Sequence, residues 1–395
     1  MKVRYTNPDI TEAEIIGIVD TLQSRHILAG KKTKRLAESV SAFCGAPYAV
    51  CVGSFTDGIE RILRLLQIGP EDEVILSAYM HPAAAHAVER VGARVVLVDI
   101  EADTYTVSPG QLASVVTPRA KAVILSDIGG VMCDYDQVRQ ALHEKRHLYQ
   151  PKNETQAAIN RVAIIGDASY SFGSRHDLYQ SGQGADFTCF SFQTERSLFV
   201  GDGAAVVWRD IVGLPHKKWQ KSHIADGLPY DPENEMTDIL SSILLSQMSR
   251  AGEANQKRHE IIDRYNESIP ESVLPLRHQG ERFKSNGAVY MARIPGMKEA
   301  ERDALMRALA AAGVETKVHF KPLPMCCEFQ RMGYSIQTFP NAFHQYESEI
   351  SLPLYVSMTD KAISHVLDSF RRCIARLGFA PRRDKVLVNS MLGNA

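Results

Sequence analysis

Residues 48–77 read YAVCVGSFTDGIERILRLLQIGPEDEVILS and contain a predicted strand, helix and second strand in succession. The runs 48–52 and 73–77 are apolar and rich in β-branched residues, which is typical of strands covered on both faces. Between them, residues 56–67 have the apolar spacing of a helix. A strand–helix–strand unit of this kind predicts an α/β fold with a mostly parallel sheet.

The same alternation continues outward from this unit to residue 208. It predicts five more strands, which makes a seven-stranded sheet, and three more helices. The additional strands are 94–98, 121–125, 162–166, 187–192 and 203–208, and the helices are 81–91, 109–115 and 134–147. The polar stretch 143–160 breaks the rhythm and is predicted to be a surface excursion.

A second lobe is predicted after a long helical stretch at 236–270. Its expected elements are a strand at 287–294, a helix at 298–312, a strand at 314–320 and a closing helix at 359–376. We therefore expect a large α/β domain, residues 1–250, and a smaller α+β domain, residues 251–395. The last fourteen residues, RRDKVLVNSMLGNA, receive no assignment.

Composition excludes several classes of protein. The chain has 395 residues, a formal net charge of -1 and a pI near 6.9, so nothing indicates a nucleic-acid or anionic-membrane partner. The start MKVRYTNPDITEAE lacks the apolar core of a signal peptide, and no apolar run is long enough to span a bilayer, which predicts a cytoplasmic location. Seven scattered cysteines without a CxxC or HExxH pattern predict buried reduced thiols and no metal site.

Three loops at the predicted carboxyl ends of strands carry polar side chains, where open α/β sheets bind ligands. In GSFTDG (53–58), Ser54 and Thr56 can hold a phosphate or simply cap the helix. In GDAS (166–169), Asp167 is either a functional carboxylate or a turn former. The segment SFQTERSLFVGDGA (191–204) begins with Ser191 and ends in a glycine-rich turn. Because that turn is not GxGxxG after a first strand, a Rossmann dinucleotide site is not expected.

The ordered motifs resemble those of the DegT/StrS family of pyridoxal-phosphate (PLP) sugar aminotransferases and dehydratases. The similarity covers most of the chain. It is carried by LAGKKTKRLAESVSAFCGAPYAVCVGSFTDGI (28–59), IGPEDEVILSAYMHPAAAHAV (68–88), DIEADTYTVSP (99–109), TPRAKAVI (117–124), CDYDQV (133–138), HFKPLP (319–324) and SLPLYVSMTD (351–360). The resemblance implies the PLP-transferase fold type I, a dimer with sites across its interface, and a nucleotide-linked sugar as substrate.

The resemblance also implies roles for individual residues. Asp167 matches the aspartate that pairs with the pyridine nitrogen and keeps the ring electron-withdrawing. Phosphate-binding positions are matched by Ser191 and by the loop containing Ser54, Phe55 and Thr56. His81 stands where the family stacks an aromatic ring on the cofactor, and its other interpretation is a histidine at the start of a helix.

One departure affects the chemistry directly. Ungapped counting from Ser191 to Gly201 places Arg196 at the position of the family's Schiff-base lysine, in SFQTERSL. A Schiff base needs a neutral primary amine, and a guanidinium stays protonated and is poorly nucleophilic. Ordinary transamination through a lysine is therefore not expected, and the cofactor is expected to bind non-covalently as PLP or as its amine form, pyridoxamine phosphate (PMP).

Further departures cluster on the same site. Tyr170 replaces a glutamine, Phe55 a glycine, Pro324 a histidine and Glu235 an arginine, while Asn234 is the candidate for the asparagine contributed to a partner's site. Such a cluster fits either a changed reaction or a lost one.

Three functions stay open at this point. The first is an aminotransferase or dehydratase without a covalent lysine link, in which Tyr170 and His319 move protons beside Arg196. The second is a catalytically inactive chain that serves as partner subunit of an active paralogue, so the dimer can be a homodimer or a heterodimer. The third is an ordinary sugar aminotransferase that uses another lysine, with candidates Lys321, Lys217, Lys218 and Lys221.

Overall fold

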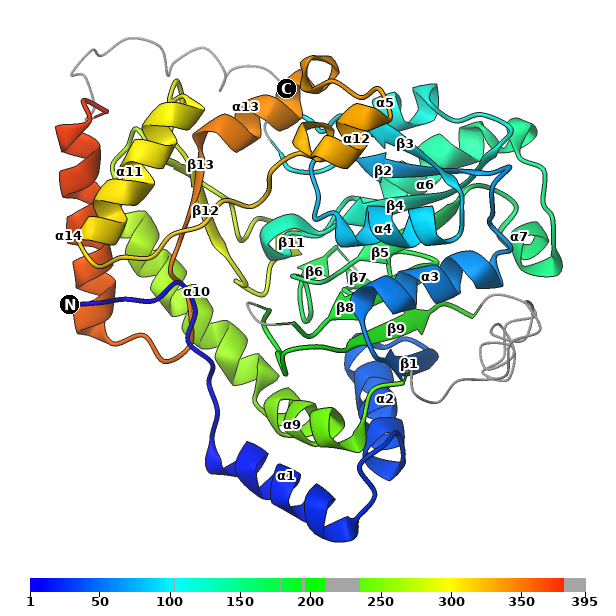
Figure 1. The fold of residues 1–395 in the computed structure, drawn as a ribbon, viewed down its shortest axis with the longest axis horizontal. Helices are drawn as coiled ribbons and strands as arrows, with labels where there is room; N and C mark the ends of the chain where they lie inside the picture. The colour runs from blue at the N-terminus through cyan, green and yellow to red at the C-terminus, as the bar shows by residue number, and fades with distance from the viewer. Residues whose placement is uncertain (103, 178, 194–195, 211–234, 380–395) are drawn as a thin grey trace.

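The computed structural model describes residues 1–102, 104–177, 179–193, 196–210 and 235–379. Within these ranges a seven-stranded sheet forms the centre of the molecule, in the order β1-β9-β8-β5-β4-β2-β3 (Figure 1). β9 runs antiparallel to both of its neighbours, and the remaining pairs are parallel. The strands are β1 (Tyr48–Val52), β2 (Glu73–Ser77), β3 (Arg94–Val98), β4 (Ala120–Ser126), β5 (Ala163–Asp167), β8 (Phe187–Ser191) and β9 (Ala204–Trp208). This confirms the predicted α/β class and the mostly parallel seven-stranded sheet.

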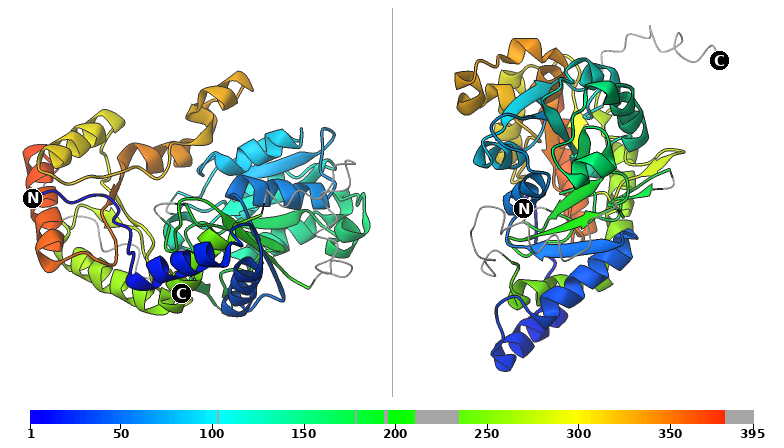
Figure 2. Two further views of the ribbon diagram at one scale, coloured as in Figure 1. Left: turned by 60° about the horizontal axis from the view of Figure 1, so that its bottom comes forward. Right: turned by 90° about the vertical axis from the view of Figure 1, so that its right-hand side faces the viewer.

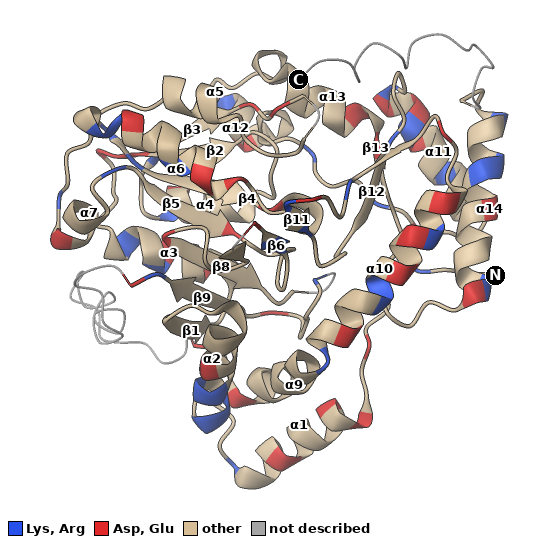
Figure 3. Cartoon of the chain, turned by 180° about the vertical axis from the view of Figure 1, so that it is seen from behind, with Lys and Arg blue, Asp and Glu red and all other residues tan. Residues whose placement is uncertain are grey.

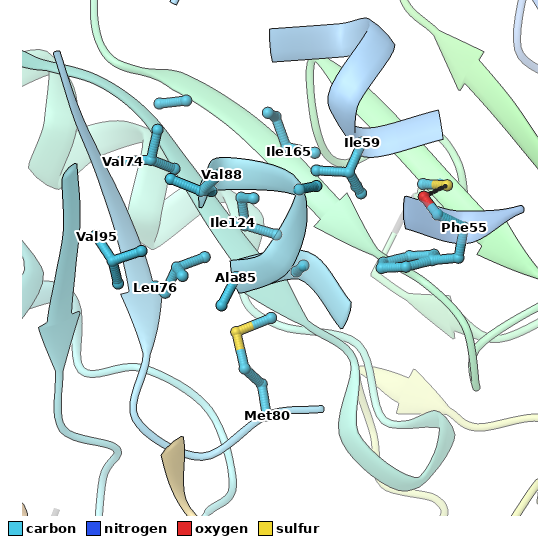
Figure 4. Packing of buried hydrophobic residues seen from close by; sticks show 14 of the residues in the cluster. Phe55, Ile59, Val74, Leu76, Met80, Ala85, Val88, Val95, Ile124 and Ile165 are labelled. Atoms are coloured by element: carbon cyan, nitrogen blue, oxygen red, sulfur yellow. Dashed lines mark hydrogen bonds between the residues drawn. The ribbon is translucent and has the colours of Figure 1, made fainter. Parts of the chain in front are cut away.

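Helices cover both faces of this sheet because alternate residues of each strand point to opposite sides. Val50 and Val52 of β1 pack with α3 (Phe55–Leu65) and α4 (Ala83–Arg90), a cluster shown in Figure 4. Ala49 and Cys51 pack instead with α2 (Lys31–Cys44) and α9 (Asp238–Ser249). Towards the other edge, that second face is covered by α5 (Pro109–Ser114) and α6 (Tyr135–Glu144).

A second core is built on a three-stranded antiparallel sheet in the order β10-β12-β13 (Figures 1 and 2). Its strands are β10 (Leu274–Pro275), β12 (Tyr290–Arg293) and β13 (Glu349–Leu352), and its helices include α10 (Ala251–Ser268), α11 (Glu299–Ala311) and α14 (Asp360–Arg376). Val3 joins this core from the N-terminus and bridges to Val314. The division into domains 1–250 and 251–395 stays a prediction.

The remaining elements are short, apart from the N-terminal α1 (Glu12–Ser24). They are β6 (Arg175–His176), β7 (Tyr179–Gln180) and β11 (Phe283–Lys284), which form a third sheet, with α7 (Glu154–Ile159), α12 (Cys327–Arg331), α13 (Pro340–Ser348) and the 3-10 turns Ile128–Gly130, Arg146–Leu148, Leu323–Met325 and Ile336–Thr338. All seven cysteines are free, and five of them are buried, as predicted; Cys326 is half-buried and Cys327 exposed. No helix of the described ranges is long and apolar enough to cross a membrane.

One prediction of local structure was wrong, and the structure refines two others. The stretch 314–320 is not a strand, because its pairing is limited to isolated bridges such as Lys317 to Ser351. The stretch 236–270 is two helices, α9 and α10, since Arg250 between them leaves helical geometry. The predicted surface excursion 143–160 is mostly exposed, and it also contains α7, whose buried Gln156 donates to the Leu66 carbonyl oxygen at 2.5 Å and accepts from Tyr149. The tail 382–395 lies outside the described residues.

Gly58 of α3 allows a test of how closely this helix packs against the sheet. A Cβ at this position would lie 2.9 Å from Cys189 Sγ and 3.0 Å from Val206 Cγ2, both in strands. Gly58→Ala is therefore expected to lower the free energy of unfolding by about 1–3 kcal/mol. The control is Gly252→Ala in α10, where nothing lies within 4 Å of the added carbon and stability should rise by about 0.4–1 kcal/mol. Urea unfolding measures both, and a neutral Gly58→Ala would show that α3 can shift.

Candidate functional site

The register of β9 sets the distance between the two predicted phosphate loops. Ala204 pairs with Val52 at the end of β1 on one side and with Ser191 at the end of β8 on the other. Adjacent strands are about 4.8 Å apart, so the ends of β1 and β8 are separated by about twice that distance. Ser54, two residues beyond β1, and Ser191 therefore flank one point at the carboxyl edge of the sheet.

Ser54 is the N-cap of α3, and its Oγ accepts from the Asp57 backbone N at 3.2 Å. Thr56 follows on the first turn and is partly exposed. An eleven-residue helix with two hydroxyls at its N-terminus favours an anion, because the first N–H groups and the helix dipole point at it. Ser191 is buried, and its Oγ accepts from Gln193 N at 3.4 Å.

Phe55 does not block this loop, although it stands where the family resemblance implies a glycine. It is the first residue of α3, and its side chain is 5% exposed within the core cluster of Figure 4. Its carbonyl oxygen lies 3.8 Å from Cys189 Sγ. Only its backbone can face a ligand, so the exchange of glycine for phenylalanine changes the core and leaves the loop open.

Asp167 is the last residue of β5 and is 4% exposed. Its Oδ1 accepts from the backbone N and the hydroxyl of Ser169, and its Oδ2 accepts from Ser126 Oγ at 3.1 Å. In the sheet it pairs with Cys189, two residues before Ser191. Three hydroxyl or amide donors hold the carboxylate in one orientation at the strand tip, where a ring nitrogen could approach it.

A second group of predicted residues meets around Tyr170. The Arg196 guanidinium lies 3.9 Å from the centre of the Tyr170 ring, close enough for a cation–π contact worth about 0.5–2 kcal/mol. The His319 ring meets Tyr170 edge-on at 5.8 Å. Phe320 lies 5.8 Å from Tyr170 and 5.8 Å from His81, so the four predicted residues share one aromatic cluster.

Two residues that the sequence analysis did not identify, Glu349 and Ser351, form hydrogen bonds with His319. Its Nδ1 lies 2.8 Å from Ser351 Oγ, and Ser351 Oγ donates to Glu349 Oε1. The backbone N of His319 donates to Glu349 Oε2 at 2.8 Å. All three side chains are buried, which lowers the pKa of His319 to about 3 and raises the pKa of Glu349 to about 8.

Asp127 is a further buried carboxyl that the sequence analysis missed. It follows β4 and accepts from Cys133 N, Tyr135 Oη and Ser171 Oγ at 2.6–3.0 Å. Burial raises its pKa to about 6. The rule that strand tips carry functional groups would have found it in the run KAVILSD, as it found Asp167. Glu349 gave no comparable signal, because it precedes the motif SLPLYVSMTD by two residues.

Other predicted positions stand apart. Lys321 is exposed and Pro324 is buried, whereas Glu235 bridges to Val52, two residues before Ser54 of the first predicted phosphate loop. Asn234 and the lysines at 217, 218 and 221 lie outside the described residues. Within the described ranges, no contact connects the three predicted phosphate-binding residues, Ser54, Thr56 and Ser191, with the aromatic cluster around Tyr170.

Comparison with known proteins adds independent evidence. The sequence model of the DegT/DnrJ/EryC1/StrS aminotransferase family matches residues 8–371. The chain is similar to Spr1654 from Streptococcus pneumoniae, which is named as a sugar aminotransferase and has been solved in PMP, apo and PLP forms. The PMP form is 34% identical in sequence, with a TM-score of 0.91, and the match covers 95% of this chain and 98% of that one. The spore coat polysaccharide biosynthesis protein SpsC of Bacillus subtilis is 28% identical over 93% of this chain and 96% of its own. The 3-amino-5-hydroxybenzoic acid synthase, 23% identical with a TM-score of 0.80, shares the fold over 94% of this chain and 98% of that one.

The burial of Glu349 gives a prediction of pH dependence. Because its pKa is raised in the folded state, its contribution to stability is fully present below the ordinary value of 4.5 and is lost as pH rises through about 8. Glu349→Gln lacks this titration. The free energy of unfolding of the natural chain, minus that of the variant, should fall between pH 5 and 8 by up to about 1.4 kcal/mol per unit. Urea unfolding across this range checks it, with the exposed Glu267→Gln as control; a constant difference would contradict the burial of an ionisable group.

Proposed function

The chain belongs to the DegT/DnrJ/EryC1/StrS aminotransferase family, and from this premise we propose that it binds PLP or PMP without a covalent link to a lysine. It would act on an amino or keto group of a small metabolite, a nucleotide-linked sugar, in a biosynthetic pathway. The observation that carries the proposal is Arg196, which stands at the predicted lysine position with its guanidinium against Tyr170. The predicted cytoplasmic location is part of the same proposal.

The residues present fit such a cofactor. Ser54, Thr56 and Ser191 would hold its phosphate together with the N-terminus of α3. Asp167 would hold a proton at the pyridine nitrogen, since its carboxylate is already oriented by Ser126 and Ser169. When bound, the group supplies an electron-withdrawing ring and, in its amine form, the amine that reacts with a carbonyl substrate.

His319 is the residue proposed to move protons. Its hydrogen bonds through Ser351 to Glu349 determine which of its two ring nitrogens carries the proton. With Glu349 ionised, the Ser351 hydroxyl donates to the carboxylate and accepts from Nδ1–H, so Nε2 keeps a lone pair and can take a proton. With Glu349 protonated, both hydrogen bonds can reverse and the ring proton moves to Nε2, which can then donate. Glu349 and Ser351 are thus proposed as positioning residues for an acid or base at Nε2.

Tyr170 and Arg196 would form the wall facing His319. The contact of the Arg196 guanidinium with the Tyr170 ring would keep that ring in place opposite His319. Arg196 cannot shuttle a proton near neutral pH, since a guanidinium is always charged. The proton transfer that the family assigns to lysine would therefore pass to His319 or Tyr170.

Absorbance spectroscopy tests this proposal. Purified protein is mixed with PLP or with PMP, freed of excess ligand, treated with borohydride and analysed by mass spectrometry. The natural chain should retain a cofactor band and show no covalent adduct, whereas Arg196→Lys should gain a borohydride-fixed adduct with PLP. Asp167→Asn should retain less cofactor, because it loses the charge opposite the pyridine nitrogen.

The other outcomes separate the alternatives. An adduct on the natural chain that disappears in Lys321→Ala would show an ordinary aminotransferase with another lysine. Failure to retain either cofactor form would overturn the enzyme proposal and favour the inactive partner of an active paralogue. If the natural chain retains PMP without an adduct, turnover of a nucleotide-linked keto-sugar by the PMP-loaded protein is the assay that names the reaction.

We propose that the chain pairs with a second copy or a paralogue through the outer face of α1. Of the eleven exposed large hydrophobic side chains in the described ranges, eight lie in residues 1–28. The helix turns Glu14 inward to Arg250 at 2.7 Å and turns Ile15, Ile16 and Val19 outward, 43–57% exposed. An exposed apolar stripe of this size is typical of an interface.

Ile16→Glu tests this interface. A charge in the centre of a buried apolar contact should weaken association by about 100-fold or more, which corresponds to about 2.7 kcal/mol. Light scattering during size-exclusion chromatography should then find the natural chain as a dimer and the variant as a monomer. The exposed Glu12→Gln on the same helix serves as control. A natural chain that is monomeric when alone, and dimeric only with a paralogue, would select the heterodimer.

A further inference from the structure

A groove of about 530 Å³ lies between loops of the central sheet and the edge of the smaller sheet, and none of the proposed roles uses it. We call it the β10 groove. Its apolar lining comes from the loop after β4 on one side and from β10, the residue after β10 and β11 on the other: Ile128, Val131, Met132, Leu274, Leu276 and Phe283. Pockets of this volume hold a drug-sized ligand, so the groove has room for several apolar side chains.

Leu274 leaves part of this lining exposed to water. It is 46% exposed and is one of three exposed large hydrophobic side chains outside residues 1–28, in the part of the chain that the structure describes. β10 is also an edge strand, and among the described residues no strand pairs with its outer side. An edge strand with an exposed apolar side chain is a place where a further extended segment can add to a sheet.

The chain leaves α14 next to this strand. α14 runs beside α10 (Figures 1 and 3), and Arg371 Nε donates to the Ser268 carbonyl oxygen at 2.7 Å. Gly378, with φ at 80°, ends α14 in the left-handed conformation that favours glycine. The Phe379 carbonyl oxygen then accepts from Ser272 Oγ at 3.2 Å. Because Ser272 precedes Leu274 by two residues, the described chain ends beside the β10 groove.

The residues after Phe379 have a sequence that matches the groove. They read APRRDKVLVNSMLGNA (380–395), and the match to the family model ends before them, at residue 371. The six residues before Val386 can span about 20 Å when extended, so the apolar run VLV can reach the groove. The basic run RRDK is complementary to acidic side chains along this path, since Glu271 is exposed next to Ser272 and Glu101 and Asp134 line the groove.

We propose that residues 386–392, VLVNSML, dock in the β10 groove of the same chain. Val386 and Val388 would point to one side of an extended segment, where they can cover Leu274 and Leu276. The short connection from Phe379 keeps the segment at a high effective concentration, so a modest contact is enough to hold it. The docked segment would connect the loop after β4 with the smaller sheet. This inference concerns a surface outside the proposed cofactor site and does not rest on cofactor binding.

Photo-crosslinking of the full-length chain tests the docking. Leu387 is replaced by the photoreactive residue p-benzoylphenylalanine, the protein is irradiated, and the adducts are mapped by mass spectrometry. Adducts are expected within one chain, to residues 128–132 or 274–283. Leu274→Glu should lower their yield about tenfold, because it places a charge in the apolar lining, and its exposed position should let the chain fold. The matched control is Met332→Glu, an exposed apolar side chain outside the groove, which should leave the yield unchanged.

Each result decides the proposal. Absence of adducts, adducts to other parts of the chain, or an equal yield from Leu274→Glu would overturn it. Irradiation of a mixture of ¹⁵N-labelled and unlabelled chains distinguishes the occupants of the groove. Adducts that join a labelled to an unlabelled chain would overturn docking within one chain and assign the groove to the same segment of a second copy. Hydrogen exchange provides a second measurement without the photoreactive residue: Leu387→Asp should speed exchange of the backbone amides of 274–277 by about tenfold, and unchanged exchange would contradict the docking.

Discussion

The pairing of Ala204 with Val52 on one side and Ser191 on the other is the constraint on which the site depends. One antiparallel strand, β9, is inserted between two strands whose carboxyl ends carry the hydroxyl groups. A slip of one residue in either ladder would exchange the side chains that face α3 and α4 with those that face α2 and α9, since strand side chains alternate. Because residues on both faces of β1 are packed in the core, such a slip would disrupt that packing and destabilise the fold. The core therefore fixes the distance between the two loops. The same sheet fixes the position of Asp167, because this residue pairs with Cys189 of β8.

The aromatic cluster around Tyr170 depends on a different set of contacts, between the sheet and the segment that follows residue 314. Tyr79, just beyond β2, donates to the His319 carbonyl oxygen, and the Leu323 N donates to the Ala78 carbonyl oxygen at 2.8 Å. These bonds tie residues 319–323 to the loop that carries His81. The arrangement explains how residues from distant parts of the sequence meet in one cluster, and why the orientation of His319 rests on β13 of the smaller sheet.

Much of the central sheet could be predicted from sequence because its strands are short continuous apolar runs. The predicted bounds of β1, β2 and β3 match those of the structure, and β8 and β9 differ by one residue. The smaller sheet was harder. β13 begins with a buried glutamate, and 314–320 looks like a strand although it pairs only at single points. No helix before residue 48 was predicted. In α1 the buried residues are the polar Glu14 and Thr21, which hides its amphipathic pattern, whereas α2 has the regular spacing of Leu36, Val40 and Cys44 and could have been predicted. In the site, Asp167 could be predicted because polar residues at the carboxyl ends of parallel strands are candidate functional groups. The partners of His319, Glu349 and Ser351, lie on β13, and no sequence pattern around them indicates that they contact His319.

The N-terminal segment connects two parts of the molecule. Tyr5, Asn7 and Asp9 line a cavity of about 60 Å³ beside Arg258, and α1, which follows, carries the exposed apolar side chains Ile15, Ile16 and Val19. Glu14 on the inner side of α1 pairs at 2.7 Å with Arg250 on the wall of this cavity. A chain that packs on the outer face of α1 would therefore also fix the position of Arg250, so pairing and the shape of the cavity depend on the same helix.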